Sequence, residues 1–446
     1  MALTAIEIFK FLPKTNCGKC GVPTCLAFAM KIANKQAELS ACPDVSEDAM
    51  ATLAESSAPP QRLVTIGADD NKIELGNETE LFRHEKKFFH QTAFSLLIED
   101  TESDDDIQKK LKEAADLKVE RIGQILEVDM IALKGSSGDP AKFEALVNTV
   151  KGATSKPLML IGDNVDVLGA GLKVCGSNRP LIYSANASNW EDLAKLAKEH
   201  SAPLAVTGAT LTELADLTQK IKGAGVEDMV VGLNYNSYGE ALQRLTILRR
   251  LVVKKTFRPL GYPIVMMPRE GVDSVIEGVQ TAIAVMKYGG IAVLKDIEAW
   301  KMFPLFTLRQ NIYTDPQIPL QVQEGLYEIN NPTEDSPLMF TTNFSLTYFT
   351  VQGDVEGSKI PSYIIVINTE GLSVMTAFAA DKLTADDVVK VLDSSGVKDK
   401  IKHKKLIIPG MVARMSGKLN ELSGFDIDVG PRESSGLPKF LKAWSA

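Results

Sequence analysis

Cysteine and histidine are scarce in this chain, and long apolar runs and excess positive charge are missing. The 446 residues include five cysteines and four histidines, and the net charge is -8. This charge argues against a nucleic acid or an anionic membrane surface as a partner, because both favour basic faces. No apolar stretch reaches the roughly eighteen residues that a membrane-spanning helix needs.

Signals for export are also missing from the start of the chain. The segment "MALTAIEIFKFLPK" is amphipathic, but it lacks a basic region, a long apolar core and a small-residue cleavage site. We therefore expect a cytoplasmic protein with no membrane and no nucleic acid among its partners. In a reducing compartment, clustered cysteines bind metal or take part in redox chemistry more often than they form structural disulfides.

Four of the five cysteines stand in the first 42 residues, with the spacing C-x2-C-x4-C-x16-C. Glycines and a proline between them supply the tight turns that wrap thiolates around one centre. A single C-x2-C knuckle, with no histidine before His84, disfavours a zinc ribbon. A Cys-Pro step at the last cysteine suits an iron–sulfur cube, so we predict a 4Fe-4S cluster, with structural zinc or unligated thiols as alternatives. The predicted ligands are Cys17, Cys20, Cys25 and Cys42; the fifth cysteine, Cys175, is interpreted as a small buried thiol.

The middle of the chain alternates apolar runs with helical patterns. Continuous apolar runs indicate strands buried on both faces, as in a parallel sheet. Eight strand–helix units predict a (β/α)8 TIM barrel over residues 92–309, preceded by a linker at 58–91. The rival is an open doubly wound sheet, but no G-x-G-x-x-G follows any run. The runs are "TAFSLLIED", "VDMIALKG", "KPLMLIGD", "RPLIYSAN", "APLAVTGA", "DMVVGLN", "YPIVMMP" and "GGIAVLKD".

Polar residues at the ends of these runs form no catalytic constellation. The barrel shows no histidine–carboxylate pair, no metal-ligand spacing and no phosphate loop. Such residues are usually solvated loop groups or helix caps, so we interpret the barrel as a unit that binds or docks. The residues are Asp100, Asp163, Asn186, Asn234, Arg269, Glu270, Asp296 and Glu298.

The last part of the chain predicts a tether at 310–337, rich in proline, asparagine and charge, and a Rossmann or flavodoxin-like α/β domain at 338–446. Three loops, 369–374, 409–410 and 430–436, follow the carboxyl ends of its expected parallel strands, the edge where open α/β sheets bind cofactors. Glycine and serine let the backbone approach a ligand, and helix N-termini offer free N–H groups. Simple short turns are the alternative to a ligand site at this edge.

The order of cysteine cluster, barrel and α/β domain resembles, over the whole length, the large (gamma) subunit of the corrinoid iron–sulfur proteins. These are the methyl carriers of the reductive acetyl-CoA (Wood–Ljungdahl) pathway. The resemblance rests on "NCGKCGVPTCLAFAM" with Cys42, "ETELFRHEKKFFH", "TTNFSLTY", "GLSVMTA" and "GPRESSG". It implies a 4Fe-4S domain at 1–57, a cobalamin-type corrinoid on the C-terminal domain and a heterodimer with a smaller barrel subunit. The corrinoid contacts that it implies are Thr341, Thr347, Gly371, Leu372, Ser373, Val374, Thr376 near the lower face, and Ser434 along the tail.

The resemblance also implies a function. Reduced cobalt(I) would accept a methyl group from methyltetrahydrofolate through a separate methyltransferase and deliver it to the nickel site of acetyl-CoA synthase. The cluster would reactivate cobalt(II) with one electron, supplied by a reductive activator or ferredoxin. The chain would then be a carrier within a methyltransferase system, with no catalytic residue assigned. The alternatives are an archaeal counterpart that uses a methanopterin donor, a barrel pterin methyltransferase with a structural cluster, and an electron-transfer adaptor.

Many cobalamin proteins carry a D-x-H-x-x-G motif whose histidine binds cobalt, and this motif is missing here. A cobalt without a lower nitrogen ligand is easier to reduce, because square-planar cobalt(I) needs no axial donor. We therefore hypothesise a base-off corrinoid without a histidine ligand. The histidines that stand outside such a motif are His84, His90, His200 and His403.

Overall fold

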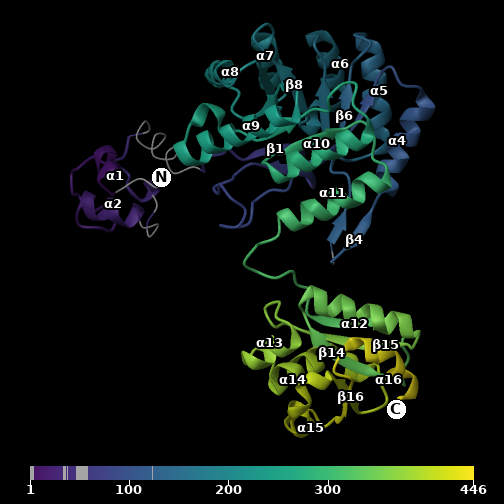
Figure 1. Cartoon of the computed structure of the whole chain (residues 1–446). Helices are drawn as coiled ribbons and strands as arrows, with labels where there is room; N and C mark the ends of the chain where they lie inside the picture. Colours follow the sequence, from purple (N-terminus) through teal and green to yellow (C-terminus); the bar gives the residue numbers. More distant parts are fainter. Residues whose placement is uncertain (1–4, 34–36, 38, 47–58, 123, 446) are drawn as a thin grey trace. The chain divides into compact units, whose positions relative to one another are not determined.

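The computed structural model describes residues 5–33, 37, 39–46, 59–122 and 124–445. The chain divides into two compact units (Figure 1). The first comprises Met1–Arg83, Phe88–Leu117 and Val128–Tyr313, and the second comprises His84–Lys87, Lys118–Glu127 and Thr314–Ala446. No helix among the described residues is long and apolar enough to cross a membrane.

The N-terminal module is a small helical fold around the cysteines. It consists of α1 (Ala5–Phe11), α2 (Cys25–Ala33) and the short η1 (Leu39–Ala41). The end of the predicted cluster domain, at residues 47–57, lies outside the described residues. The buried core of the module mixes helix residues with two of the cysteines: Ile8, Leu12, Val22, Cys25, Phe28, Ala29 and Cys42.

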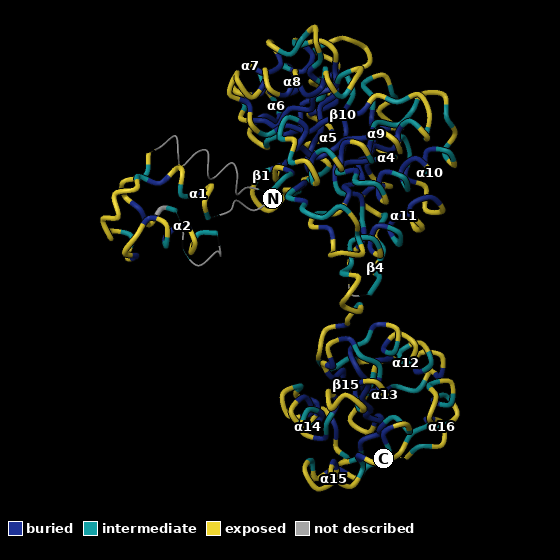
Figure 2. The backbone as a smooth tube through the Cα atoms, turned by 60° about the vertical axis from the view of Figure 1, so that its left-hand side comes forward, coloured by how far each residue is buried: buried dark blue, intermediate teal, exposed yellow. Residues whose placement is uncertain are grey.

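Eight parallel strands close into a barrel, in the order β10-β11-β12-β3-β6-β7-β8-β9. This confirms the predicted TIM barrel, and each of the eight apolar runs contains one of its strands. Burial explains the pattern, because all four residues of β7 and of β12 are buried; Figure 2 shows the buried strands inside and exposed residues outside. The strands are β3 (Ala93–Glu99), β6 (Met130–Lys134), β7 (Leu158–Ile161), β8 (Leu181–Ala185), β9 (Leu204–Gly208), β10 (Met229–Leu233), β11 (Ile264–Met266) and β12 (Ile291–Leu294).

A helix follows each barrel strand and packs outside it. Helix starts agree with the capping chemistry of the sequence: the Thr210 hydroxyl, for example, accepts a hydrogen bond of 3.2 Å from the Glu213 N–H. Cys175 is buried at the end of α6, which confirms its interpretation, and burial raises its pKa to about 11. The helices are α4 (Asp104–Asp116), α5 (Pro140–Ala153), α6 (Val165–Cys175), α7 (Trp190–Glu199), α8 (Leu211–Gly223), α9 (Tyr238–Arg249), α10 (Ser274–Met286) and α11 (Ala299–Ile312), with the short turns η2 (Gly176–Asn178), η3 (Arg250–Lys254) and η4 (Arg258–Leu260) and the hairpin β4 (Val119–Arg121)–β5 (Gln124–Leu126).

A hairpin occupies the segment that the sequence predicts to be a linker. Strands β1 (Val64–Ala68) and β2 (Asn71–Leu75) pair antiparallel. Buried Val64, Ile66 and Leu75 pack with the interior residues of the barrel. The Gly67 N–H donates to the carbonyl of Arg179, just before β8, so the hairpin lies at the amino ends of the strands. These residues therefore close the bottom of the barrel.

The C-terminal domain is a five-stranded mixed sheet, in the order β13-β15-β14-β16-β17. Without β13, the order of the four parallel strands is the flavodoxin-like 2-1-3-4. Helices α12 and α16 cover one face of the sheet, and α13, α14 and α15 cover the other. The elements are β13 (Gly325–Ile329), β14 (Leu338–Thr342), α12 (Ser345–Ser358), β15 (Ser362–Ile367), α13 (Val374–Ala379), α14 (Ala385–Ser394), η5 (Val397–Asp399), β16 (Lys405–Ile408), η6 (Gly410–Met415), α15 (Ser416–Ser423), β17 (Asp426–Val429), η7 (Ser434–Gly436) and α16 (Leu437–Ala443).

The predicted tether at 310–337 contains β13, which pairs antiparallel with β15 at the edge of the sheet. Only one of the five residues of β13 is buried. An edge strand with so little burial does not need the continuous apolar run of a central strand. Backbone hydrogen bonds also join Ser345 to Leu320 and Val322 to Asn343. Residues 313–319 lie between the end of α11 and these anchored residues.

Candidate functional site

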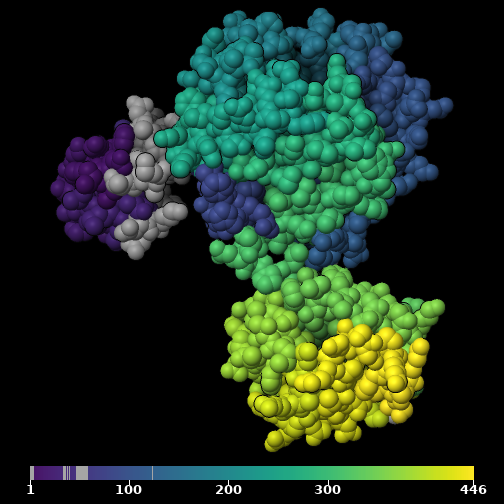
Figure 3. Space-filling model, in the orientation of Figure 1, coloured from purple at the N-terminus to yellow at the C-terminus, as the bar shows by residue number. Residues whose placement is uncertain are grey.

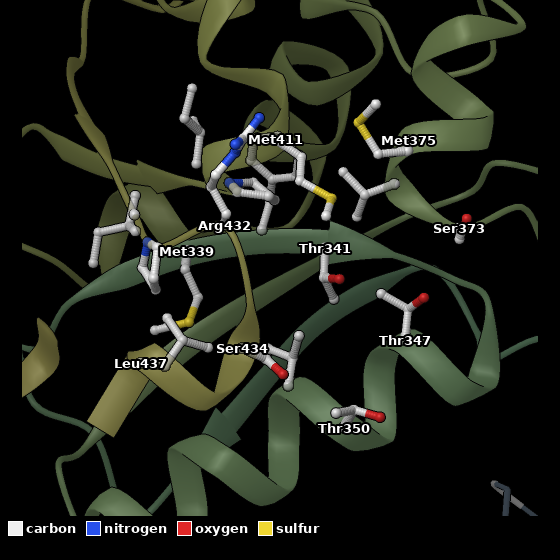
Figure 4. A pocket seen from close by; sticks show the side chains of 18 of the residues that line it. Met339, Thr341, Thr347, Thr350, Ser373, Met375, Met411, Arg432, Ser434 and Leu437 are labelled. Atoms are coloured by element: carbon white, nitrogen blue, oxygen red, sulfur yellow. The ribbon is translucent and has the colours of Figure 1, made fainter. Parts of the chain in front are cut away.

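A cavity of about 430 Å³ lies in the C-terminal domain (Figure 4). It opens where β14 and β16 are neighbours, with Met339 of β14 opposite Ile407 of β16. From β14 the chain continues to β15 on one side, and from β16 it continues to β17 on the other, so this is the topological switch point where open α/β sheets bind ligands. The lining residues are Met339, Phe340, Thr341, Leu346, Thr347, Thr350, Val351, Ser373, Val374, Met375, Ile407, Ile408, Pro409, Met411, Gly430, Pro431, Arg432, Ser434 and Leu437.

One wall of the cavity carries hydroxyl groups. Figure 4 shows Thr341, Thr347 and Ser373 on the same side, coming from β14, α12 and the residue before α13. The Thr341 hydroxyl is buried and has no hydrogen-bond partner among the described residues. A buried unpaired hydroxyl costs about 1–3 kcal/mol, so Thr341 fits a ligand that supplies a hydrogen-bonding group.

The remaining lining is mostly apolar, and parts of it are open to solvent. Leu346, Met375 and Met411 line the cavity with 68%, 48% and 44% of their surface exposed. Three methionines, Met339 included, give the cavity a polarisable surface that adapts to the shape of a ligand. The arrangement suits a largely apolar ligand that carries amide or other polar groups along one edge.

Two loops interlock at one side of the cavity. The Gly410 N–H donates to the Pro431 carbonyl at 3.1 Å, and the Gly430 N–H donates to the Ile408 carbonyl at 2.9 Å. A Cβ on Gly410 would lie 2.5 Å from the Gly430 oxygen, so this contact requires glycine. In the space-filling view, the yellow C-terminal segments form a large part of one face of this domain (Figure 3).

The structure brings five of the predicted contact residues to the cavity, and their role in binding stays a prediction. Gly371, Leu372 and Thr376 do not line it. The Gly371 N–H donates to the Asn343 side-chain oxygen at 3.1 Å, which holds the loop after β15. Leu372 packs against the core, and the Thr376 hydroxyl lies 3.0 Å from that of Ser373. The five residues at the cavity are Thr341, Thr347, Ser373, Val374 and Ser434.

Other lining residues were not singled out from the sequence. Met411 and Arg432 lie in or beside the loops that glycine and proline marked, so those loops were a usable signal. Met339 and Thr350 lie within a strand and a helix, where nothing in the sequence separates a cavity-facing side chain from a core one.

Histidine does not occur among the described residues that line the cavity. His403 lies at the other end of the sheet: its Nε2 lies 2.9 Å from the carbonyl of Ser336, just before β14, and its Nδ1 accepts from the N–H of Lys405, the first residue of β16. The histidine of this domain is therefore engaged at the amino ends of the strands, away from the cavity.

The cysteine loop of the N-terminal module is built around tight turns. Gly18 and Gly21 have φ values of +71° and +77°, which glycine adopts without strain. The Asn16 side-chain oxygen accepts a hydrogen bond of 2.8 Å from the Cys25 N–H, at the start of α2. Cys20 packs against the same core that contains Cys25 and Cys42.

Charge is also placed beside this loop. Lys19 Nζ lies 3.0 Å from Asp44; this hydrogen bond lowers the pKa of Asp44 and raises that of Lys19. The thiols of Cys17 and Cys42 lie close enough to Lys19 to interact electrostatically with it. A neighbouring cation stabilises thiolates, the form in which cysteine binds metal.

Among the described residues, no three histidine, cysteine or carboxylate groups are gathered closely enough to hold one metal ion. A 4Fe-4S cube binds one thiolate at each of its four irons. The four-thiol donor set and its tight loop therefore fit a cluster.

The polar residues at the carboxyl ends of the barrel strands are used locally. Asp100 accepts hydrogen bonds from the backbone and hydroxyl of Ser137. Asp296, just after β12, forms an ion pair of 2.5 Å with Lys301. Burial raises the pKa of Tyr235, whose hydroxyl donates to the Met267 carbonyl. These contacts are structural, and a role of the barrel in binding or docking stays a prediction.

Known proteins match this chain along its whole length. A family model described as CO dehydrogenase/acetyl-CoA synthase delta subunit matches residues 63–441, and an Fe-S cluster model matches residues 12–43. The corrinoid/iron-sulfur protein large subunit of Moorella thermoacetica is 42% identical over 445 residues, 99% of each chain. The acetyl-CoA decarbonylase/synthase complex subunit gamma of Methanothermobacter thermautotrophicus is 32% identical over 453 residues, also 99% of each chain.

Among solved structures, dihydropteroate synthase from Thermus thermophilus is similar with a TM-score of 0.40 and 15% identity, over 56% of this chain and 99% of that one. The family assignment comes from the sequence matches, which extend through barrel and C-terminal domain alike. With these matches, the chain belongs to the CO dehydrogenase/acetyl-CoA synthase delta subunit family.

Proposed function

We propose that this chain carries a methyl group in the acetyl-CoA pathway, on a corrinoid bound at the C-terminal cavity. The bound corrinoid supplies a cobalt centre that accepts the methyl group from methyltetrahydrofolate and releases it to the nickel site of acetyl-CoA synthase. The observation that carries the proposal is the cavity at the switch point, with its unpaired Thr341 hydroxyl. The names of the two relatives support the cofactor and the pathway.

The lining residues have separate tasks in this proposal. Thr341, Thr347 and Ser373 would hydrogen-bond amide groups of the corrinoid, while Met375 and Met411 would pack against its apolar surface. The described lining residues include no histidine, so none of them would offer an imidazole to a bound cobalt. We propose that this keeps the reduced metal accessible.

In this proposal the cysteine module holds a 4Fe-4S cluster, which supplies single electrons for reactivation. The ligands are the four thiolates, and the cation of Lys19 lies near those of Cys17 and Cys42. The tight turns at Gly18 and Gly21 orient the first thiolates toward one centre. The proposed ligands are Cys17, Cys20, Cys25 and Cys42.

A methyl carrier needs several partners. We propose a heterodimer with a small corrinoid iron–sulfur subunit, and transient complexes with a methyltetrahydrofolate methyltransferase and with acetyl-CoA synthase. A reductive activator or ferredoxin would supply electrons. The word "large" in the name of the Moorella thermoacetica relative supports a smaller partner subunit.

Metal analysis and a visible spectrum of the chain purified with its small subunit test this function. We expect cobalt and iron together, with corrinoid bands over a broad iron–sulfur shoulder. In methyl transfer assays, the loaded complex should take the methyl group from methyltetrahydrofolate when the methyltransferase is added. A preparation that contains zinc and no cobalt, and that binds no added corrinoid, would contradict the proposal.

A further inference from the structure

One lining residue has a chemistry that the rest of the cavity lacks. Among the described lining residues, Arg432 is the one with a charged side chain. It is exposed and has no ion-pair partner in the described part of the chain. Figure 4 shows it on the other side of the cavity from Thr347 and Ser373. The cavity therefore presents the hydroxyls of Thr347 and Ser373 on one side and a cation on the other.

The backbone at Arg432 is held in place by the interlocked loops. The preceding residue, Pro431, accepts the hydrogen bond from Gly410, and a Cβ on Gly410 would lie 3.0 Å from the Arg432 nitrogen. A Cβ on Gly436 would lie 2.8 Å from the Pro431 ring, so the far side of the loop is equally close-packed. The backbone of Arg432 is thus held in place, and its exposed side chain is available to bind a ligand.

A guanidinium group beside an apolar cavity favours an anionic ligand group. Arginine matches phosphate geometry with paired N–H donors, and such charge-assisted bonds are stronger than neutral ones. The amide side chains of a corrinoid are neutral, and its nucleotide tail contains a phosphodiester. We infer that Arg432 binds this phosphodiester, and that the cavity thereby selects complete corrinoids over corrinoids without the tail. This inference rests on the proposed corrinoid function.

Titration of the full chain with two corrinoids distinguishes the contribution of the nucleotide tail to binding from that of the corrin ring. Hydroxocobalamin carries the nucleotide tail and dicyanocobinamide lacks it, and visible difference spectra follow the binding of each. We expect Arg432→Gln to weaken cobalamin binding on the order of tenfold to a hundredfold, the range for a lost charge-assisted bond. Cobinamide should bind the variant as it binds the parent chain. The cobalamin affinity of Arg432→Lys should lie between those of the parent chain and Arg432→Gln, because lysine keeps the charge and loses the paired donors.

Arg414→Gln is the matched control. Arg414 is also exposed in the C-terminal domain, near the end of η6, and does not line the cavity. This variant removes the same charge from the same domain, so it reports any general electrostatic effect. It should bind both corrinoids as the parent chain does, and thermal unfolding should confirm that all variants fold.

The outcomes are distinct. Loss of cobalamin affinity confined to the Arg432 variants supports the assignment. Equal losses for cobalamin and cobinamide, or no loss for either, would overturn it while the proposed function stands. If the parent chain binds neither corrinoid but binds flavin mononucleotide through Arg432, both the inference and the proposed function are wrong.

Discussion

Individual hydroxyl groups determine which ligand groups the cavity can bind. Thr341 and Thr342 follow one another in β14, and both hydroxyls are buried without a partner among the described residues. Thr341 lines the cavity and Thr342 does not. Comparing the two threonines therefore distinguishes the stability cost of a buried hydroxyl from its contribution to ligand binding.

We predict that Thr341→Val stabilises the cofactor-free chain by up to about 1 kcal/mol, because a buried unpaired hydroxyl is removed. The same change should weaken corrinoid binding several-fold. Thr342→Val should give the stabilisation without the loss of affinity. Chemical denaturation and spectral titration measure the two effects, and equal losses of affinity in both variants would contradict the role of Thr341.

The cysteines offer a second test at this scale. We predict that Cys42→Ala loses most of the cluster iron, because a predicted ligand in the core of the module is removed. Cys175→Ala is the control, since this thiol is buried beside the Gly171 carbonyl in α6. Iron and sulfide analysis checks both, and full iron content in Cys42→Ala would rule out this cysteine as a ligand.

At the scale of elements, the strand ends and their loops build the site. β14 and β16 place their carboxyl ends side by side, and the loops after β16 and β17 pack backbone against backbone. The sequence marks these loops with glycine and proline. The close approach explains why the contact between Gly410 and Gly430 allows no side chain.

We predict that Gly410→Ala weakens corrinoid binding at least about tenfold, because the added methyl would push the two loops apart. Gly417→Ala serves as the control. Gly417 lies in α15 with no atom within 4 Å of an added Cβ. Its replacement should stabilise the helix by up to about 1 kcal/mol and leave binding unchanged. Unchanged binding in Gly410→Ala would show that the loop contact does not shape the site.

At the scale of the whole molecule, the connection between barrel and C-terminal domain is shorter than the composition suggests. The barrel ends with half-buried Tyr313, whose hydroxyl lies 3.1 Å from that of Thr92. The C-terminal domain is anchored from Leu320 onward. Residues 314–319 join these two parts, and the proposed role as a carrier that serves two enzymes calls for a hinge there.

We predict that brief digestion with a broad-specificity protease cuts first within 314–319, where Ile318 is 53% exposed. Mass spectrometry of the fragments locates the cut. Resistance of this segment, with first cuts inside either folded unit, would argue against a mobile connection.

Much of this architecture could be predicted from the sequence alone. Eight apolar runs specify eight barrel strands, because a strand buried on both faces must be apolar throughout. The cysteine spacing marks the metal module, and the capping pair Thr384–Asp387 marks the start of α14, where both capping hydrogen bonds form. Each of these signals is local, so the order of residues carries it.

Other features depend on contacts between distant segments. The short strands β1 and β13 are not buried throughout, so no continuous apolar run marks them, and they form by pairing with their partner strands. Met339 and Arg432 meet at one cavity because β14 and β17 lie on either side of β16. The sequence by itself determined which segments form strands, helices and loops; the tertiary structure decided which side chains face the cavity, because that depends on how separate strands pack together.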